Sequence, residues 1–411
     1  MYKRRYRAFD FTILWTTICF VFLFALPSYA DILDEDETKF PEEINVEESV
    51  EFGPSSEAHV EIGFNIFEDI ARARGLLGEQ RCGFKLAKTK RLKVKKVLRG
   101  KKLVRLLRGN GGQRPELGGF TILIAIENVK TREIKIVRVH PRLGGKSGGI
   151  VIEPGKSNGV NTKFNIIYSE QYIVLAVKRP VRSGTGFKEV VYTPYSEDLD
   201  VPVVRKAGFD YLKNVIGAAK NDLLKRGVQP LSGDMFVDDE VAFVLAIIEH
   251  IDPQKFENGN YTMERLIHET LVIMGTNTHN AYRYSVSKAG ARGLFQFIPK
   301  TYKRMVAMYP RAGLKKDFIQ GMEDHENAAK ASFLLFDSDI CVLGNERVKN
   351  VKAGGDTLGR FLASAYNCGS GRTRIAMDRY GYDWHLGLPA ETQTYLKKFD
   401  VVWEWLSRET Y

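Results

Sequence analysis

The pattern of apolar residues changes once along this chain of 411 residues, and this change constrains the fold more than any other feature. Between Gly118 and Pro202, short segments rich in Ile and Val, such as FTILIAIENV and QYIVLAVKR, alternate with clusters of Gly, Ser, Asn and Pro. Such segments are typical of strands joined by turns. After Gly233 the chain is mostly helical in its pattern to the end. We therefore expect a multidomain α+β protein, with a β-rich sandwich or barrel followed by an all-α domain.

The N-terminus has the features of a secretory signal peptide over residues 1–30. A basic start, MYKRRYR, precedes an uncharged apolar run over residues 11–26, and the small residues Ser28 and Ala30 suit a signal peptidase. The run is short for a bilayer span, so an uncleaved anchor is the weaker alternative. We expect export to the periplasm or cell envelope, with a mature chain that begins at Asp31.

Two segments of opposite charge follow this leader. Residues 31–80 are acidic and are expected to be largely disordered. Residues 81–108 contain thirteen Lys or Arg and no acidic residue, and they could form a β-hairpin or one basic amphipathic helix. This basic stretch indicates either a contact with an anionic envelope polymer or the solvated face of a sheet. Export makes nucleic acid an unexpected partner, although the formal net charge is +11.

These patterns predict five parts. They are a signal peptide (1–30), an acidic segment (31–80), a basic β-rich domain of unknown role (81–205), a helical linker (206–233) and a helical domain (234–411). Three cysteines follow the leader, so at most one intramolecular disulfide is possible. Cys341 and Cys368 are the expected pair if one forms, because both lie in the helical domain and the compartment is oxidising.

One carboxyl group stands out at the end of an apolar helix. In DDEVAFVLAIIEHIDP the run 241–248 is apolar on all sides, which predicts a buried helix that ends before Pro253. Glu249 falls in its last turn, where burial and the helix dipole both raise a carboxyl pKa. A general acid needs such a pKa. In the alternative, the side chain reaches solvent or pairs with a Lys or Arg.

A second carboxyl group is also a candidate acid. In YTMERLIHETLVIMG, Glu269 lies mid-helix at the edge of an apolar face. The simpler interpretation is an ion pair with Arg265 one turn earlier. His250 and His268 are expected on helix surfaces.

The stretch SKAGARGLFQFIPKTY combines flexible and polar residues. Gly290 and Gly293 permit a positive φ or a close backbone approach. Gln296 lies between two Phe, as a hydrogen-bonding group in a cleft would. A tight turn before a core helix is the alternative.

This stretch resembles the Ser-x-x-Gly-Ala-x-Gly-Leu-x-Gln-x-x-Pro-x-Thr motif of the lytic transglycosylases that cleave bacterial peptidoglycan. The matching residues are Ser287, Gly290, Ala291, Gly293, Leu294, Gln296, Pro299 and Thr301. Downstream, ASAYNCGSGR is similar to the Ala-Tyr-Asn-Ala-Gly segment of that family, with Cys368 where Ala is usual. ETQTYLKKF is similar to its Glu-Thr-x-x-Tyr segment. Together the similarities cover about residues 240–400.

The resemblance implies a lysozyme-like α fold with one catalytic Glu at the end of a buried helix, normally followed by Ser or Thr. Glu269 is followed by Thr270, whereas Glu249 lies at the helix end but is followed by His250. We favour Glu249 and keep Glu269 as the alternative. The resemblance also implies substrate binding by Ser287, Gly290, Ala291, Gly293, Gln296, Tyr366, Asn367 and Tyr395. Core packing or turn formation would equally explain these residues.

The reaction implied by the resemblance is cleavage of the MurNAc–GlcNAc bond of peptidoglycan glycan strands. A single Glu serves as acid and then base, and the product carries a 1,6-anhydro-MurNAc end. The family needs no metal or other cofactor. A lysozyme-like hydrolase of the same bond and a non-catalytic peptidoglycan-binding scaffold remain the alternatives.

Overall fold

The computed structural model describes most of the chain after residue 64. The described residues are 65–86, 96–99, 102–105, 117–155, 159–167, 171–183, 186–233, 236–259, 261–353 and 358–408. The expected signal peptide and cleavage site lie outside them, as does most of the acidic segment. Within these ranges, no helix combines the length and the apolar character that a membrane span requires.

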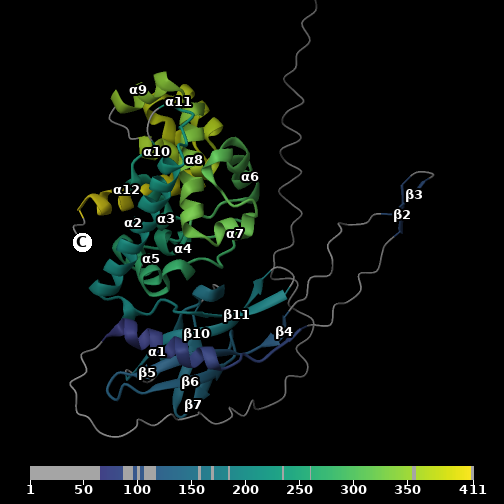
Figure 1. Ribbon diagram of the computed structural model, residues 1–411, viewed down its shortest axis with the longest axis vertical. Coiled ribbons are helices and arrows are strands. Elements are labelled where there is room, and N and C mark those ends of the chain that lie inside the picture. Colours follow the sequence, from purple (N-terminus) through teal and green to yellow (C-terminus); the bar gives the residue numbers. More distant parts are fainter. Residues whose placement is uncertain are drawn as a thin grey trace, which may run out of the picture. The chain divides into compact units, whose positions relative to one another are not determined.

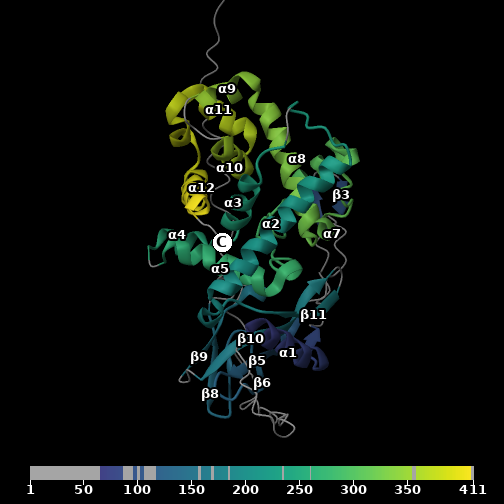
Figure 2. The ribbon, with the colours of Figure 1, turned by 60° about the vertical axis from the view of Figure 1, so that its left-hand side comes forward.

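The first described element is a helix, α1 (Ile66–Glu79). Its N-cap Asn65 accepts a hydrogen bond from the backbone N–H of Glu68, and its buried side chains recur at helical spacing. The helix lies against strands β5 (Ile122–Asn128) and β10 (Tyr172–Ser183) (Figures 1 and 2). The expectation of a largely disordered segment over residues 31–80 therefore does not hold for its last part, because these apolar residues find a sheet to cover.

The β-rich region contains two main antiparallel sheets. The first has the order β11 (Gly186–Tyr192), β10 (Tyr172–Ser183), β5 (Ile122–Asn128) and β6 (Ile134–Val139). The second has the order β7 (Gly145–Ser147), β8 (Ile150–Pro154) and β9 (Phe164–Ile167). Every pairing is antiparallel.

Strand β5 is buried along its whole length because both of its faces are covered. Leu123 and Ala125 belong to the large core that includes α1. Ile124 and Ile126 belong to a second apolar cluster, which they share with Ile152 of β8. The region is therefore layered, with a helix and the smaller sheet on opposite faces of the four-stranded sheet, and the expected β-rich fold is confirmed.

Two further two-stranded sheets lie in the described residues. β1 (Phe84–Leu86) pairs with β4 (Leu117–Phe120), and β2 (Lys96–Arg99) pairs with β3 (Lys102–Arg105). The second pair lies in the basic stretch, which thus forms a hairpin and not a helix in its described part.

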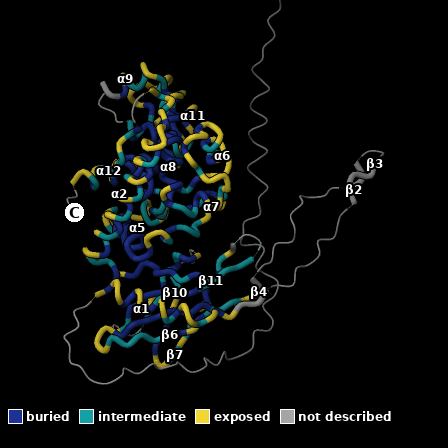
Figure 3. Tube along the Cα trace, viewed as in Figure 1, coloured by how far each residue is buried: buried dark blue, intermediate teal, exposed yellow. Residues whose placement is uncertain are grey.

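The rest of the described chain is helical, as the pattern predicts. Its helices are α2 (Pro202–Lys225), α3 (Asp239–Ile248), α4 (Pro253–Glu257), α5 (Met263–Asn277), α6 (Pro299–Met308), α7 (Phe318–Met322), α8 (His325–Leu343), α9 (Asn345–Ala353), α10 (Leu358–Cys368), α11 (Ser370–Tyr380) and α12 (Ala390–Arg408). All residues from Val241 to Ile248 in α3 are buried, and most of α8 is buried as well (Figure 3). These two helices form the centre of the helical core.

Helix α2 is part of this core, although residues 206–233 are expected to form a linker. It crosses α5 at two glycines, where each backbone touches the other. A Cβ on Gly208 would lie 2.0 Å from the Leu271 carbonyl oxygen, and one on Gly275 would lie 2.3 Å from the Val204 carbonyl oxygen. Only glycine permits this approach, so α2 packs as a structural helix.

The C-terminal end of α5 contacts the β-rich region through a buried polar cluster. Arg74 of α1 donates hydrogen bonds to the Thr276 carbonyl at 2.7 Å and to Oδ1 of Asn277 at 2.8 Å. The Asn277 side chain also exchanges bonds of 2.9 and 2.8 Å with the backbone N–H and C=O of Thr193. The cluster fixes the segment that leads from α5 toward residues 287–298, which precede α6 and are called the motif loop below.

Cys82, Cys341 and Cys368 are free thiols. The disulfide considered between Cys341 and Cys368 is therefore absent from the structure. Cys82 is buried, and its Sγ donates to the Lys178 carbonyl.

Candidate functional site

Glu249 caps the C-terminal end of α3, immediately after the buried run. The side chain is half-buried, and Oε1 accepts a hydrogen bond of 2.6 Å from the Tyr395 hydroxyl. Burial raises the pKa of Glu249 to about 7, while the Tyr395 bond and the charge of Lys398 oppose that rise and Glu391 adds to it. The carboxyl group can thus hold a proton near neutral pH and release it in the same range.

Helix α12 supplies the side chains that surround this carboxyl group. Glu391, Tyr395 and Lys398 lie at positions i, i+4 and i+7, which share one face of a helix. Tyr395 is buried, and burial together with the Glu249 charge raises its pKa well above the ordinary value, so it remains a donor. Lys398 is also buried and donates to the Ile251 carbonyl at 2.9 Å, and burial lowers its pKa.

Tyr366 of α10 contacts the motif loop and lies within the electrostatic influence of this carboxyl group. Its hydroxyl donates to the Phe295 carbonyl, and its ring meets Phe297 edge-on at a centroid distance of 5.8 Å. Burial and, after it, the Glu249 charge raise the pKa of Tyr366. The structure therefore brings Glu249, Tyr366 and Tyr395 together, from three different helices.

Asn367 follows Tyr366 and fixes the start of α12. Its Oδ1 accepts a hydrogen bond of 2.7 Å from Thr392, a buried residue that the sequence analysis did not single out. The sequence could have indicated Thr392, because it is the first Thr of the ETQTY segment and matches the Thr of the Glu-Thr-x-x-Tyr pattern. The bond joins two of the three similar segments.

The first half of the motif forms a tight turn. The Ser287 hydroxyl accepts from the Ala291 N–H at 3.0 Å, and the Ser287 N–H donates to the Ala291 carbonyl at 2.9 Å. Gly290 has a φ of +82°, which the turn requires. Ser287 is exposed, so its hydroxyl organises the turn at the surface.

The second half of the motif is set by close packing. Gly293 has a φ of +73°, and a Cβ there would lie 2.3 Å from the Met322 carbonyl oxygen. Gln296 has a φ of +45°, unusual for a residue with a side chain. Its Nε2 donates to the Gly293 carbonyl at 2.8 Å, which fixes the direction of the half-buried amide.

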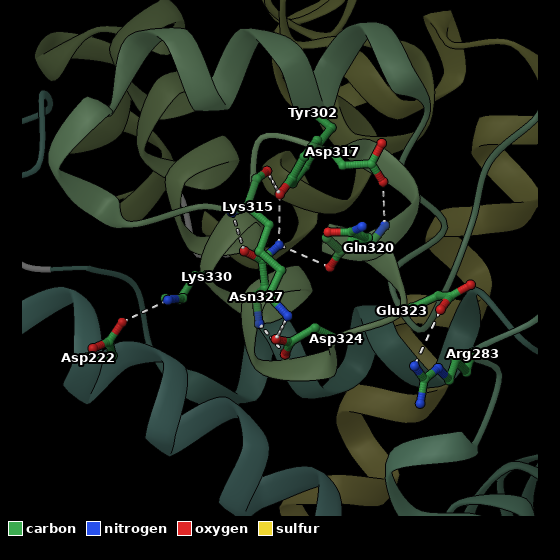
Figure 4. A network of polar contacts seen from close by, with 11 residues as sticks. Asp222, Arg283, Tyr302, Lys315, Asp317, Gln320, Glu323, Asp324, Asn327 and Lys330 are labelled. Atoms are coloured by element: carbon green, nitrogen blue, oxygen red, sulfur yellow. Dashed lines mark hydrogen bonds and ion pairs between the residues drawn. The ribbon is translucent and has the colours of Figure 1, made fainter. Parts of the chain in front are cut away.

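A network of polar contacts connects α6, the helix that follows the motif loop, with α8 (Figure 4). The Tyr302 hydroxyl donates to the Lys315 carbonyl at 2.6 Å and accepts from Asn327 of α8 at 2.8 Å. The Asn327 amide also bonds the Gly321 carbonyl and the Lys315 N–H. These bonds satisfy backbone groups of Lys315, between α6 and α7, and of Gly321 in α7.

Glu269 has a different environment. Lys255 of α4 donates to its Oε1 at 2.8 Å and to its Oε2 at 2.5 Å. The expected pairing partner was Arg265, which instead contacts Glu197. The structure thus pairs Glu269 with a cation, whereas it places Glu249 against tyrosines.

The two histidines expected on helix surfaces are not surface residues. His268 is buried and contacts Arg205. His250 is half-buried, and its ring stacks on Tyr282 at a centroid distance of 3.5 Å. Its ring nitrogen Nε2 lies 2.9 Å from the Leu294 carbonyl oxygen. For His250 the expectation was wrong because the residues after α3 lie against the motif loop, and for His268 it was wrong because Arg205 of α2 packs against its ring.

Another carboxyl group, that of the buried Asp339 of α8, lies near Tyr366. Burial raises the pKa of Asp339 to about 6, against the opposing effects of Ser370 and Arg304. Its charge contributes to the raised pKa of Tyr366. Within the described ranges, no group of three His, Cys, Asp or Glu side chains is arranged to hold a metal ion.

A cavity of about 250 Å³ lies at the other end of α3, between α2 and α12. It is lined by Phe209, Lys213, Ile216, Asp239, Glu240, Phe243, Trp403, Leu406 and Ser407. None of the predicted site residues lines it. The cavity is therefore separate from the group around Glu249.

Comparison with known families agrees with the motif. Residues 280–382, about a quarter of the chain, match the family model of the transglycosylase SLT domain. The match includes the motif loop, Tyr366 and Asn367, while Glu249, Glu269 and Tyr395 lie outside it. No curated protein and no solved structure gives a significant match. The family match and the motif geometry together identify the helical C-terminal half of this chain as the part that contains a transglycosylase SLT domain, the type of domain found in lytic transglycosylases that act on peptidoglycan.

Proposed function

We propose that this protein is an exported lytic transglycosylase that cleaves the MurNAc–GlcNAc bond of peptidoglycan, with Glu249 as its single acid and base. The observation that carries the proposal is the position of Glu249. It lies at the end of a buried helix, its carboxyl group bonds the Tyr395 hydroxyl at 2.6 Å, and its pKa is raised to about 7.

The proposed reaction needs one group that donates a proton and then accepts one. Protonated Glu249 gives its proton to the glycosidic oxygen as the bond from that oxygen to the anomeric carbon breaks. The resulting carboxylate takes the proton of the C6 hydroxyl of the same MurNAc, whose oxygen closes on the anomeric carbon. The products are a free hydroxyl on the leaving sugar and a 1,6-anhydro ring, and Glu249 is protonated again.

The neighbours of Glu249 suit both halves of this cycle. Burial favours the protonated form before the first transfer, whereas the Tyr395 hydroxyl and the Lys398 charge stabilise the carboxylate between the two transfers. A pKa near the working pH allows both transfers to proceed. Glu269 lacks this arrangement, because Lys255 donates a hydrogen bond to each of its carboxylate oxygens.

The amide and aromatic groups of the motif loop and of α10 provide the proposed sugar contacts. Gln296 and Asn367 are polar groups fixed by the backbone and by Thr392. Tyr366 donates to the Phe295 carbonyl of the loop and lies within the electrostatic influence of Glu249. Four further residues shape the motif loop: Ser287, Gly290, Ala291 and Gly293. We propose that they contact the glycan mainly through their backbone atoms.

Digestion of purified peptidoglycan tests the proposal. The wild-type protein should release muropeptides that carry 1,6-anhydro-MurNAc, identified by mass spectrometry. Glu249→Gln should abolish release while Glu269→Gln retains substantial activity. The reverse result would transfer the role to Glu269. Reducing ends in place of anhydro ends would indicate a hydrolase, and binding without cleavage by the wild type would indicate a scaffold.

A further inference from the structure

His250 touches two segments that are separate from its own helix. Its ring is parallel to that of Tyr282, with a centroid distance of 3.5 Å and an interplanar angle of 9°. On its edge, Nε2 lies 2.9 Å from the carbonyl oxygen of Leu294 in the motif loop. One imidazole thus joins the end of α3, the segment after α5 and the motif loop.

The hydrogen bond defines the state of the ring. A carbonyl oxygen can only accept, so Nε2 carries the hydrogen. Burial lowers the pKa of His250 to about 3, with the Leu294 bond opposing this effect and His325 adding to it. The ring is therefore neutral wherever Glu249 titrates, and its contribution is geometric.

Tyr282 is itself held in an unusual conformation. It is buried and has a φ of +54°, which is rare for an aromatic residue. Its N–H donates to the hydroxyl of Tyr192 at 3.4 Å, and Tyr192 is a fully buried residue of β11. The β-rich region thus supports the residue on which His250 stacks.

Two successive backbone carbonyls of the motif loop accept hydrogen bonds from side chains outside the loop. Leu294 O accepts from His250, and Phe295 O accepts from Tyr366. The following residue is Gln296. The two residues that precede Gln296 are therefore hydrogen-bonded to the end of α3, through His250, and to α10, through Tyr366.

We propose that His250 is a positioning residue, which holds Glu249 and the motif loop in register through its contacts with Tyr282 and Leu294. The inference rests on the proposed role of Glu249 and extends it to a residue where lytic transglycosylases are expected to have Ser or Thr. It also gives the β-rich region a part in the site, because Tyr192 supports Tyr282.

Two variants separate the contacts of His250. His250→Phe keeps an aromatic ring for stacking but removes the donor, and His250→Gln restores a donor that can reach the Leu294 carbonyl. His279→Gln, at an exposed histidine, is the matched control. We expect kcat on peptidoglycan to fall about tenfold or more in His250→Phe, with KM within about twofold. His250→Gln should recover part of the loss, and His279→Gln should equal the wild type.

The pKa of Glu249 gives a second readout that does not require activity. For the wild type and for each His250 variant, the free energy of unfolding is measured against pH, with Glu249 present and with Glu249→Gln added. The difference between the two curves gives the pKa of Glu249 in that background. The titratable groups that face Glu249 are Glu391, Tyr395 and Lys398 of α12 and Tyr366 of α10, and they are unchanged in these variants. Misplacement should admit water and lower this pKa in His250→Phe, relative to the wild type.

The outcomes are distinct. If the wild type is inactive but His250→Phe lowers the pKa of Glu249, the proposed reaction fails and the positioning role stands. An unchanged pKa together with unchanged kcat would overturn the positioning role. So would a loss of activity that only follows the folded fraction, with His250→Gln no better than His250→Phe.

Discussion

Glu249→Gln should make the protein more stable at alkaline pH, because it removes a charge from a site that disfavours one. The glutamine keeps an oxygen that can accept the 2.6 Å hydrogen bond from Tyr395. It also fits the same space at the end of α3. The substitution therefore changes the ability to ionise and little else.

The magnitude follows from the pKa of Glu249, which burial raises from 4.5 to about 7. Since the folded-state pKa lies above the unfolded one, the stability is fully present below pH 4.5 and is lost as the pH rises through 7. A shift of this size corresponds to about 3 kcal/mol. Glu249→Gln should thus match the wild type near pH 4.5 and exceed its free energy of unfolding by up to about 3 kcal/mol at pH 8.

Urea unfolding at pH 5 and pH 8 measures this difference. Asp339 also titrates in this range, but it is present in both proteins and cancels from the comparison. Glu269→Gln is the control: it removes a partly exposed ion pair with Lys255, so it should lose about 0.5–1 kcal/mol at both pH values. The reasoning is refuted if Glu249→Gln is less stable than the wild type at pH 8, or if the difference does not grow with pH.

Three further predictions concern a hydrogen bond, a close backbone contact and the expected cleavage site. Tyr395→Phe removes a bond that favours charged Glu249, so the alkaline limb of the pH–rate profile should move up by about one pH unit; a downward shift would contradict the assigned contact. Gly208→Ala should lower stability by about 1–3 kcal/mol or more in thermal unfolding, because its Cβ would lie 2.0 Å from the Leu271 carbonyl, whereas Gly217→Ala, with no atom within 4 Å, should not lower stability. N-terminal sequencing of the exported protein should begin at Asp31, and a retained residue 1 would instead indicate an anchor.

Local sequence signals predicted the elements that carry the candidate site. The apolar run 241–248 and the following Asp-Pro pair predicted a buried helix with Glu249 at its end, and both features appear. The glycines of the motif predicted positive φ values or a close approach, and Gly293 shows both. These features depend on neighbours in sequence, which is why they could be derived.

Other features depend on residues far apart in the chain. The hydrogen bond between Tyr395 and Glu249 spans 146 residues, so helical periodicity could not supply it. The inward position of His250 depends on Tyr282 and Leu294, which belong to other segments. Helix α1 was missed for another reason: the acidic composition of residues 31–80 outweighed the spacing of its four buried apolar residues.

Glu249 and Glu269 have identical side chains but different environments, and for this reason we expect only Glu249 to act as acid and base. Glu269 accepts two bonds from Lys255, whose side chain is 33% exposed. The cation whose charge lowers the pKa of Glu249 is Lys398. Lys398 is buried, donates to the Ile251 carbonyl and has a lowered pKa itself. Its attraction is therefore too weak to cancel the effect of burial on Glu249. A single carboxyl group that must both give and take a proton needs this balance, and α12 supplies it by placing a hydroxyl, and not an ammonium group, in contact with the acid.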